Sequence, residues 1–120
     1  MGRRFLIVGV AVASIAGCGG EPPDPATPAV AVRQWGTFVN ERDWDSACHL
    51  STAVGGACVS QLRRDFPSGH LSFSGPAING AGPKRGESYF AFERDGDTVF
   101  VTAVRTGQTY RVRVDSIILR

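Results

Sequence analysis

ESYFAFERDGDTVFVTAV (residues 87–104) is the stretch of this sequence that decides the fold. It contains two runs of aromatic and β-branched residues, 89–92 and 98–104, on either side of Asp95-Gly96. Such runs favour β-strands, and an Asp-Gly dipeptide between them is a strong signal for a hairpin turn. The stretch therefore predicts an antiparallel β-hairpin.

A further strand is expected on each side of this hairpin. Apolar and polar residues alternate at 71–74 and again at 110–115. Alternation with a period of two is typical of a strand that has one face in solvent. Thr106-Gly107 marks the second chain reversal, and the glycine-containing residues 75–86 are expected to form an irregular loop. We predict a four-stranded antiparallel meander.

The first half of the chain has apolar residues spaced three or four apart, which is typical of amphipathic helices. We predict helices over about 28–41, over a short segment after Asp43, and over about 57–66, with Thr27 and Asp43 as caps. Residues 51–56 are expected to separate the second and third helices. The predicted apolar faces comprise Val32, Trp35, Phe38, Val39, Trp44, Ala47, Cys48, Cys58, Leu62 and Phe66. This order predicts an α+β fold, with three helices packed on a curved antiparallel sheet of about four strands.

The composition allows one domain. The chain has 120 residues, with 13 Lys and Arg against 11 Asp and Glu. Arg3 and Arg4 belong to an N-terminal export segment, so the remainder carries 11 basic and 11 acidic residues. A formally neutral domain gives no indication of nucleic-acid binding and predicts no polybasic patch for anionic lipid. We expect a single domain over 30–120.

Residues 1–17 have the three parts of an export signal. Met-Gly-Arg-Arg begins the chain, an apolar stretch covers 5–15, and small residues lead up to Cys18. The apolar stretch is shorter than the roughly 20 residues that a transmembrane helix needs. The pattern predicts a signal peptide, with cleavage at another residue or a short anchor helix as alternatives. The pair Arg3-Arg4 lacks the spacing of a twin-arginine signal, which favours the general secretory route.

Ile15-Ala16-Gly17-Cys18 resembles the lipobox of bacterial lipoproteins, which has an aliphatic residue, two small residues and a cysteine. The resemblance implies that the Cys18 thiol receives a diacylglycerol and that the chain is cut before Cys18. The new amino group can then be acylated, with palmitate as the expected chain. The resemblance therefore implies a lipid-anchored protein of the cell membrane and envelope that faces the extracytoplasmic side.

The segment that follows Cys18 is expected to be a spacer. Residues 19–29 contain four prolines and two glycines. Such a composition favours a semi-extended chain, which spans at most ~30 Å at about 3.1 Å per residue. We therefore predict that residues 18–29 form a tether between the lipid and the folded domain.

Cys48 and Cys58 are the two cysteines that remain once Cys18 is acylated. An even pair of cysteines in an exported protein indicates a disulfide. Both cysteines lie on the apolar faces of neighbouring predicted helices. We expect a disulfide between Cys48 and Cys58.

The order of three helices and a curved sheet resembles the nuclear transport factor 2-like superfamily, whose domains are cone-shaped, and within it the small bacterial lipoproteins. The residues that carry this resemblance are the helix around Trp35–Phe38, the segment 41–48 and the closing strand Tyr110–Asp115. The superfamily contains enzymes and binding modules. The resemblance, which spans about 30–118, therefore implies a fold rather than an activity.

No set of residues predicts a catalytic, cofactor or metal site. His49 and His70 could join Cys48 and Cys58 around zinc, but no CxxC or HxxxH pair is present and the disulfide competes for both thiols. Cys48 and His49 point about 100° apart on a helix, so they cannot form a nucleophile and base pair. We expect no cofactor and no metal.

Three interpretations of function follow. We favour a non-enzymatic domain that binds an envelope protein or a small ligand at the concave face of the sheet or at the 75–86 loop. A small isomerase- or dehydratase-like enzyme would use Tyr89, Tyr110 and Asp115. The alternative is that the tyrosines are core residues of the sheet with a polar tip and that Asp115 lies on its exposed face. An accessory subunit of an envelope complex is the third interpretation. Lys84-Arg85 is interpreted as a solvated loop tip, with a contact for an acidic partner as the alternative.

Overall fold

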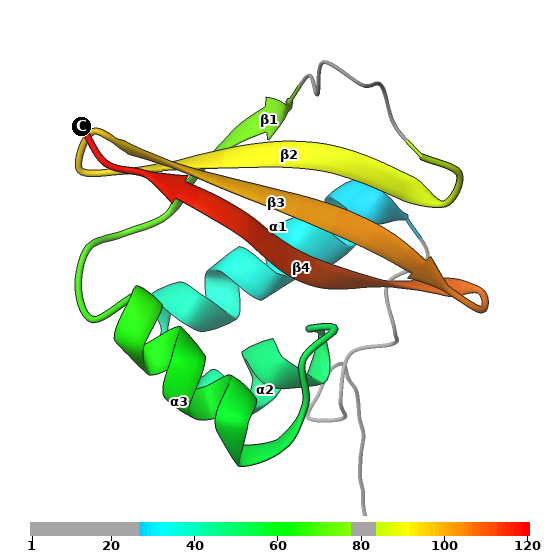
Figure 1. Cartoon of the computed structure of the whole chain (residues 1–120), viewed down its shortest axis with the longest axis horizontal. Helices are drawn as coiled ribbons and strands as arrows, with labels where there is room; N and C mark the ends of the chain where they lie inside the picture. The colour runs from blue at the N-terminus through cyan, green and yellow to red at the C-terminus, as the bar shows by residue number, and fades with distance from the viewer. Residues whose placement is uncertain (1–26, 78–83) are drawn as a thin grey trace, which may run out of the picture.

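The computed structural model describes residues 27–77 and 84–120, in which three helices precede four strands (Figure 1). The elements are α1 (Pro28–Asn40), α2 (Trp44–His49), α3 (Gly55–Asp65), β1 (Ser72–Pro76), β2 (Glu87–Arg94), β3 (Asp97–Thr106) and β4 (Thr109–Ile118). The predicted α+β class, with three helices and a four-stranded antiparallel sheet, is confirmed. The predicted export signal, Cys18 and most of the tether lie outside the described residues. Among the described residues, no helix combines the length and apolar composition needed to cross a membrane.

The sheet is a meander in the order β1-β2-β3-β4, and all neighbouring strands are antiparallel. Asp95 and Gly96 form the β2–β3 turn with φ angles of 52° and 93°. Positive φ at both residues is what this two-residue turn requires, so the Asp-Gly prediction is confirmed. The second reversal lies at Gly107-Gln108, one residue later than predicted, because Thr106 already pairs with Thr109.

Side-chain caps explain where α1 and α2 begin. The hydroxyl of Thr27 accepts a hydrogen bond from the Val30 amide (3.4 Å), and Pro28 occupies the first position of α1. The carboxylate of Asp43 accepts a hydrogen bond from the Ser46 amide (3.3 Å) at the start of α2. Both caps occupy amide groups that have no partner within the helix, as the sequence predicted.

Helix α3 begins at Gly55, two residues earlier than predicted. Gly55 has a φ of 73°, a conformation that glycine adopts without strain. The chain therefore turns into the helix at Gly55-Gly56, two residues that were predicted to lie in the break between the helices. Phe66 follows the last helical residue and is buried.

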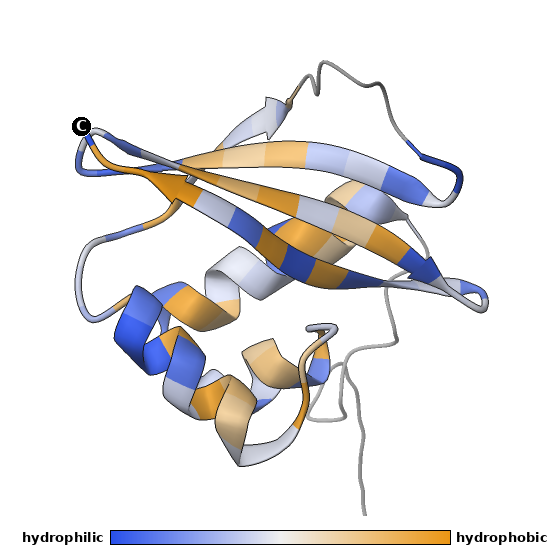
Figure 2. Ribbon diagram, in the orientation of Figure 1, coloured by the Kyte–Doolittle hydropathy of each residue, from blue (hydrophilic) through white to orange (hydrophobic). Residues whose placement is uncertain are grey.

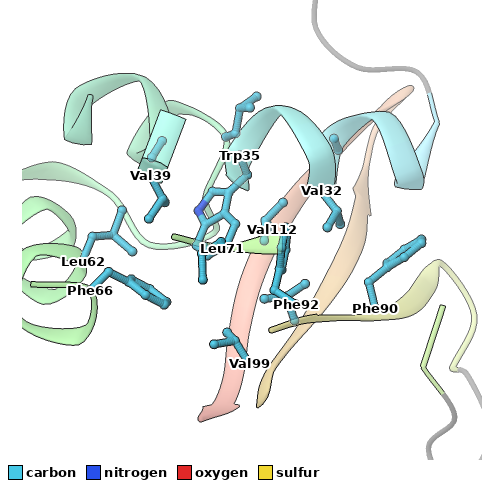
Figure 3. Close-up of a cluster of buried hydrophobic side chains, with 14 of the residues drawn as sticks. Val32, Trp35, Val39, Leu62, Phe66, Leu71, Phe90, Phe92, Val99 and Val112 are labelled. Atoms are coloured by element: carbon cyan, nitrogen blue, oxygen red, sulfur yellow. The ribbon is translucent and has the colours of Figure 1, made fainter. Parts of the chain in front are cut away.

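The core lies between α1 and one face of the sheet. Helix α1 packs against all four strands, whereas α2 and α3 lie further from the sheet (Figure 1). Apolar residues concentrate on α1 and in the middle of the strands (Figure 2). Trp35 is fully buried (Figure 3). The centroid of its ring lies 5.7 Å from the ring centroid of Phe66 and 5.8 Å from that of Phe92. These three rings fill the space between the layers.

Gly36 allows α1 to approach the sheet closely. It is buried on the face of α1 beside Trp35, and a Cβ atom at this position would lie 2.6 Å from Cε1 of Phe92. Real Cβ atoms do not come this close to a ring. The contact therefore sets the distance between α1 and β2.

Replacing Gly36 with alanine should lower the free energy of unfolding by about 1–3 kcal/mol, because the Phe92 ring must move within a packed core. Gly56→Ala in α3 is the matched control, since no heavy atom lies within 4 Å of the added Cβ. That control should raise stability by up to about 1 kcal/mol, because alanine favours helices. Urea denaturation measures both changes, and equal effects of the two substitutions would contradict the role given to Gly36.

Candidate functional site

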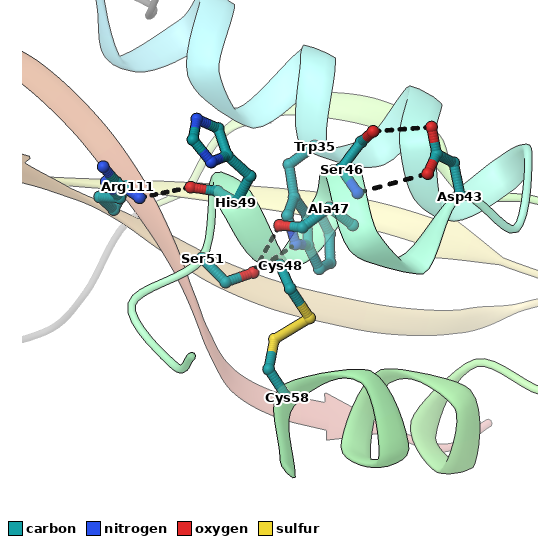
Figure 4. Close-up of a disulfide and its surroundings, with 9 residues drawn as sticks. All are labelled: Trp35, Asp43, Ser46, Ala47, Cys48, His49, Ser51, Cys58 and Arg111. Atoms are coloured by element: carbon teal, nitrogen blue, oxygen red, sulfur yellow. Dashed lines mark hydrogen bonds between the residues drawn. A yellow bond between two sulfur atoms is a disulfide. The ribbon is translucent and has the colours of Figure 1, made fainter. Parts of the chain in front are cut away.

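The two cysteines of the domain lie side by side. Cys48 in α2 and Cys58 in α3 are both buried, and their sulfur atoms lie 2.09 Å apart (Figure 4). This placement agrees with the predicted disulfide and ties the two helices together. Cys18, the predicted lipid-bearing residue, lies outside the described residues.

Ser51, next to this pair, connects three parts of the fold. Its hydroxyl donates a hydrogen bond to the carbonyl of Ala47 (2.8 Å) and accepts one from Nε1 of Trp35 (3.2 Å) (Figure 4). The neighbouring backbone pairs with β4, because the amide of Val112 donates to Leu50 (2.6 Å). The surroundings of the disulfide are therefore structural. They hold α2 against α1 and β4.

The histidines are not assembled into a metal site. His49 and His70 are both exposed, and Cys48 and Cys58 are at bonding distance from each other. In 27–77 and 84–120, no three His, Cys, Asp or Glu side chains come together in a way that could hold a metal ion. The carbonyl of His49 accepts a hydrogen bond from the guanidinium of Arg111 (Figure 4).

The sheet has a second face, opposite α1, which we call the open face. Phe90, Val101 and Val112 belong to the core on the α1 side. Because successive side chains of a strand point to opposite faces, their neighbours point away from α1. Glu87, Tyr89, Phe100 and Arg113 thus lie on the open face, as does Thr102, which its neighbours cover.

A cleft of about 480 Å³ lies over this face. Its lining side chains include two cations, two carboxylates and two aromatic rings, namely Lys84, Arg113, Glu87, Asp115, Tyr89 and Phe100. The charges sum to zero, and the rings offer flat apolar surface. Mixed polar and aromatic linings of this kind suit ligand binding.

Arg113 is the centre of the charged groups in the cleft. Its Nε donates to Asp115 (2.9 Å) and its Nη1 donates to Glu87 (3.3 Å). The hydrogen bond with Asp115, followed by the charges of Asp115 and Glu87, raises the pKa of Arg113 above its ordinary value. The hydroxyl of Tyr89 donates to the other oxygen of Glu87 (3.3 Å). The guanidinium is thus held between two carboxylates.

A bulge in β4 places Asp115 in this network. Val101 pairs with Val114 and Phe100 pairs with Ser116, so Asp115 is an extra residue between two paired positions. Such bulges redirect a side chain. The carboxylate of Asp115 accepts a hydrogen bond from the hydroxyl of Thr102, which is fully buried. Asp115 is exposed, as expected, and the hydrogen bond with Thr102 is a contact that the sequence did not predict.

The three residues proposed for an enzyme are not brought together. Tyr89 and Asp115 line the cleft, whereas Tyr110 packs against the core. Asp115 and Glu87 are both hydrogen-bonded to Arg113. The cleft therefore contains two of the three residues, and the carboxylates that line it are engaged by Arg113.

A second depression of about 630 Å³ lies between α1 and β1. Arg33 and His70 line it, and the guanidinium of Arg33 lies 4.7 Å from the centroid of the Phe73 ring. Asn40, at the end of α1, forms two hydrogen bonds with the backbone of Leu71, of 3.0 Å and 2.7 Å. This depression has a structural role, because its polar groups join α1 to the start of β1.

Sequence reasoning missed several of these polar contacts. Ser51 lies in a segment that the sequence presents only as a break between helices. Glu87 and Arg113 meet because β2 and β4 lie on either side of β3, and Thr102 meets Asp115 only because of the bulge. The position of Thr102 between Tyr89 and Arg113 becomes visible only once the strand pairing is known.

Comparison with protein families, with curated proteins and with solved structures finds no match for this chain.

The Cys48–Cys58 pair gives a stability prediction. Replacing both cysteines with alanine should lower the free energy of unfolding by about 2–3 kcal/mol, because the bridge restricts a short loop in the unfolded chain. Ser60→Ala, an exposed position in the same helix, is the control and should change stability by less than about 0.5 kcal/mol. Denaturation of the protein with and without reductant measures the effect. Identical midpoints under both conditions would show that the pair is not oxidised.

Proposed function

We propose that the chain is an exported lipoprotein, anchored to the extracytoplasmic side of a cell membrane through a lipid on Cys18. The observation that carries this proposal is the sequence Ile15-Ala16-Gly17-Cys18 after a charged start and a short apolar stretch. These features occur together at the spacing of a lipoprotein signal. The segment 19–27, rich in proline and glycine, then connects the anchor to α1.

The other two cysteines support export. Free thiols are the normal state in a reducing cytosol, whereas disulfides persist in oxidising compartments. Cys48 and Cys58 lie at bonding distance in a buried position between α2 and α3. This arrangement suits a protein that folds outside the cytosol.

We infer a binding role for the folded domain, as a cone-shaped member of the nuclear transport factor 2-like superfamily. In the described part of the chain, Trp35, Phe66 and Phe92 fill the space between α1 and the sheet. The space between α1 and the sheet is thus occupied by apolar rings and not by groups that would react with a substrate. The cleft on the open face has balanced charges and two half-buried rings, which favours an envelope protein or a small polar ligand as the bound molecule.

Replacing Cys18 with alanine should abolish attachment of lipid, because the thiol that receives the diacylglycerol is gone. Cells grown with labelled palmitate should label the normal chain and not the Cys18→Ala chain. Mass spectrometry of the N-terminus should find an acylated Cys18 only in the normal chain. Ser14→Ala is the control, since it changes the signal while keeping the lipobox. Equal labelling of the Cys18→Ala chain would refute the lipid anchor.

The proposed binding role predicts which residues change their NMR signals when a ligand binds. Small polar compounds and peptides that bind the lipidated chain in detergent micelles should shift the NMR signals of Tyr89, Phe100 and Arg113. Signals of the Arg33 and His70 region, in the second depression, serve as the internal control. Binding that shifts only those control signals would contradict the assignment of the site to the open face.

A further inference from the structure

The charged residues of the domain are separated along the sheet, and residues 27–120 carry 11 basic against 9 acidic side chains. Lys84 and Arg85 precede β2, Arg105 lies near the end of β3, and Arg111 lies near the start of β4. Lys84, Arg85 and Arg105 are exposed and Arg111 is half-buried. We call these four residues the basic end.

Strand pairing brings the four residues together. Val104 pairs with Glu87 on one side and with Arg111 on the other, and the amide of Arg105 donates to Gly86 (2.8 Å). The start of β2 and the β3–β4 hairpin therefore share one end of the sheet, where hydrophilic residues gather in Figure 2. The balanced composition predicted no polybasic patch, whereas strand pairing brings these four basic residues to one end of the sheet. The patch is assembled by pairing between strands that are distant in sequence.

The positive charge of the basic end is largely uncompensated. In the ranges 27–77 and 84–120, none of its four residues forms a salt bridge, and Glu87 is paired with Arg113 instead. Arg105 donates to Gly107 (3.0 Å), and Arg111 donates to a carbonyl, which orient the two guanidinium groups without neutralising them. Among nearby acids, Asp45 shares a surface depression with Arg111. The carboxylates of Glu93, Asp95 and Asp97 belong to the opposite end of the sheet, at the β2–β3 hairpin.

The chain enters the domain at the same end. Asn40, at the end of α1, bonds to Leu71, and the next residue Ser72 pairs with Glu93 near the β2–β3 hairpin. Helix α1 must therefore begin at the other end, and Figure 1 shows its first turn at the end of the sheet that holds the β3–β4 hairpin. The connection to Cys18 thus leaves the domain, at Thr27, from the basic end.

We propose that the basic end binds the headgroups of anionic phospholipids, so that the anchored domain stands with its β2–β3 hairpin pointing away from the membrane. This proposal rests on the lipid anchor at Cys18. Residues 19–26 span roughly 25 Å at about 3.1 Å per residue in polyproline geometry, so a lipid on Cys18 leaves the basic end within reach of the membrane surface. Each lysine or arginine that reaches an anionic surface strengthens binding about five-fold. Glu21 and Asp24 in the tether oppose this attraction, which the domain must therefore supply.

Lys84 provides a site-specific probe, because it is the only lysine of the chain. The lipidated chain carries a donor dye attached to Lys84 by reductive alkylation, which keeps the positive charge of the amine, and is reconstituted into vesicles with an acceptor dye on the headgroups. Energy transfer should be greater in vesicles that contain phosphatidylglycerol than in vesicles of phosphatidylcholine alone. High salt should remove the difference, because it shortens the screening length from about 10 Å to a few ångströms.

Charge reversal identifies the surface responsible. The R85E/R105E variant should lose the difference between the two vesicle types, and R85E alone, at an exposed residue, should reduce it. The matched control is R63E/R64E, which reverses two exposed arginines in the last turn of α3 and should keep the full difference. Circular dichroism checks that each variant is folded.

The outcomes separate this proposal from the lipid anchor. A chain that floats with both vesicle types and gives equal energy transfer in them would overturn the orientation alone. A loss of the difference in R63E/R64E that matches the loss in R85E/R105E would also overturn it. An unacylated Cys18 found by mass spectrometry would overturn the anchor and, with it, the orientation.

Discussion

The burial of the Trp35 indole fixes how the helices pack against the sheet. Its ring packs between Phe66, which follows α3, and Phe92 in β2, and its Nε1 donates to Ser51. A buried indole nitrogen needs an acceptor, so the position of Ser51 is fixed together with the ring. Gly36 then brings the backbone of α1 against Phe92. A change in any of these contacts would alter the distance between the helix and the sheet.

Features that depend on neighbouring residues were predictable from the sequence. The Asp95-Gly96 turn, the caps Thr27 and Asp43 and the alternation of the strands each reflect local conformational preference. The placement of Cys48 beside Cys58 also agrees with the sequence, because both lie on the apolar faces of consecutive helices. Local preference did not locate the start of α3, where Gly55 turns the chain into the helix.

Features that depend on strand register were not predictable. The sequence shows Arg113 as one charged residue in an alternating strand, and it does not show that Glu87 and Asp115 hold its guanidinium. The extra residue in β4 changes which side chain reaches Thr102. The same register gathers the basic end from three separate segments. Lys84 lines the open-face cleft as well as belonging to that end, so the proposed orientation would place the cleft near the lipid surface.

The pairing of residues 50–52 with Val112 has a consequence for proteins crowded on a membrane. An unpaired sheet edge can add strands from a neighbouring molecule, and this leads to aggregation. On β4, the amide of Val112 donates to Leu50 and its carbonyl accepts from Thr52, so these edge groups are occupied within the molecule. The other edge, β1, is short, has a register shift before Gly75 and ends at Pro76, which has no amide hydrogen to offer. The middle of β4 and the end of β1 therefore resist strand addition between neighbouring copies of the chain, which anchoring to one surface would bring to high local concentration.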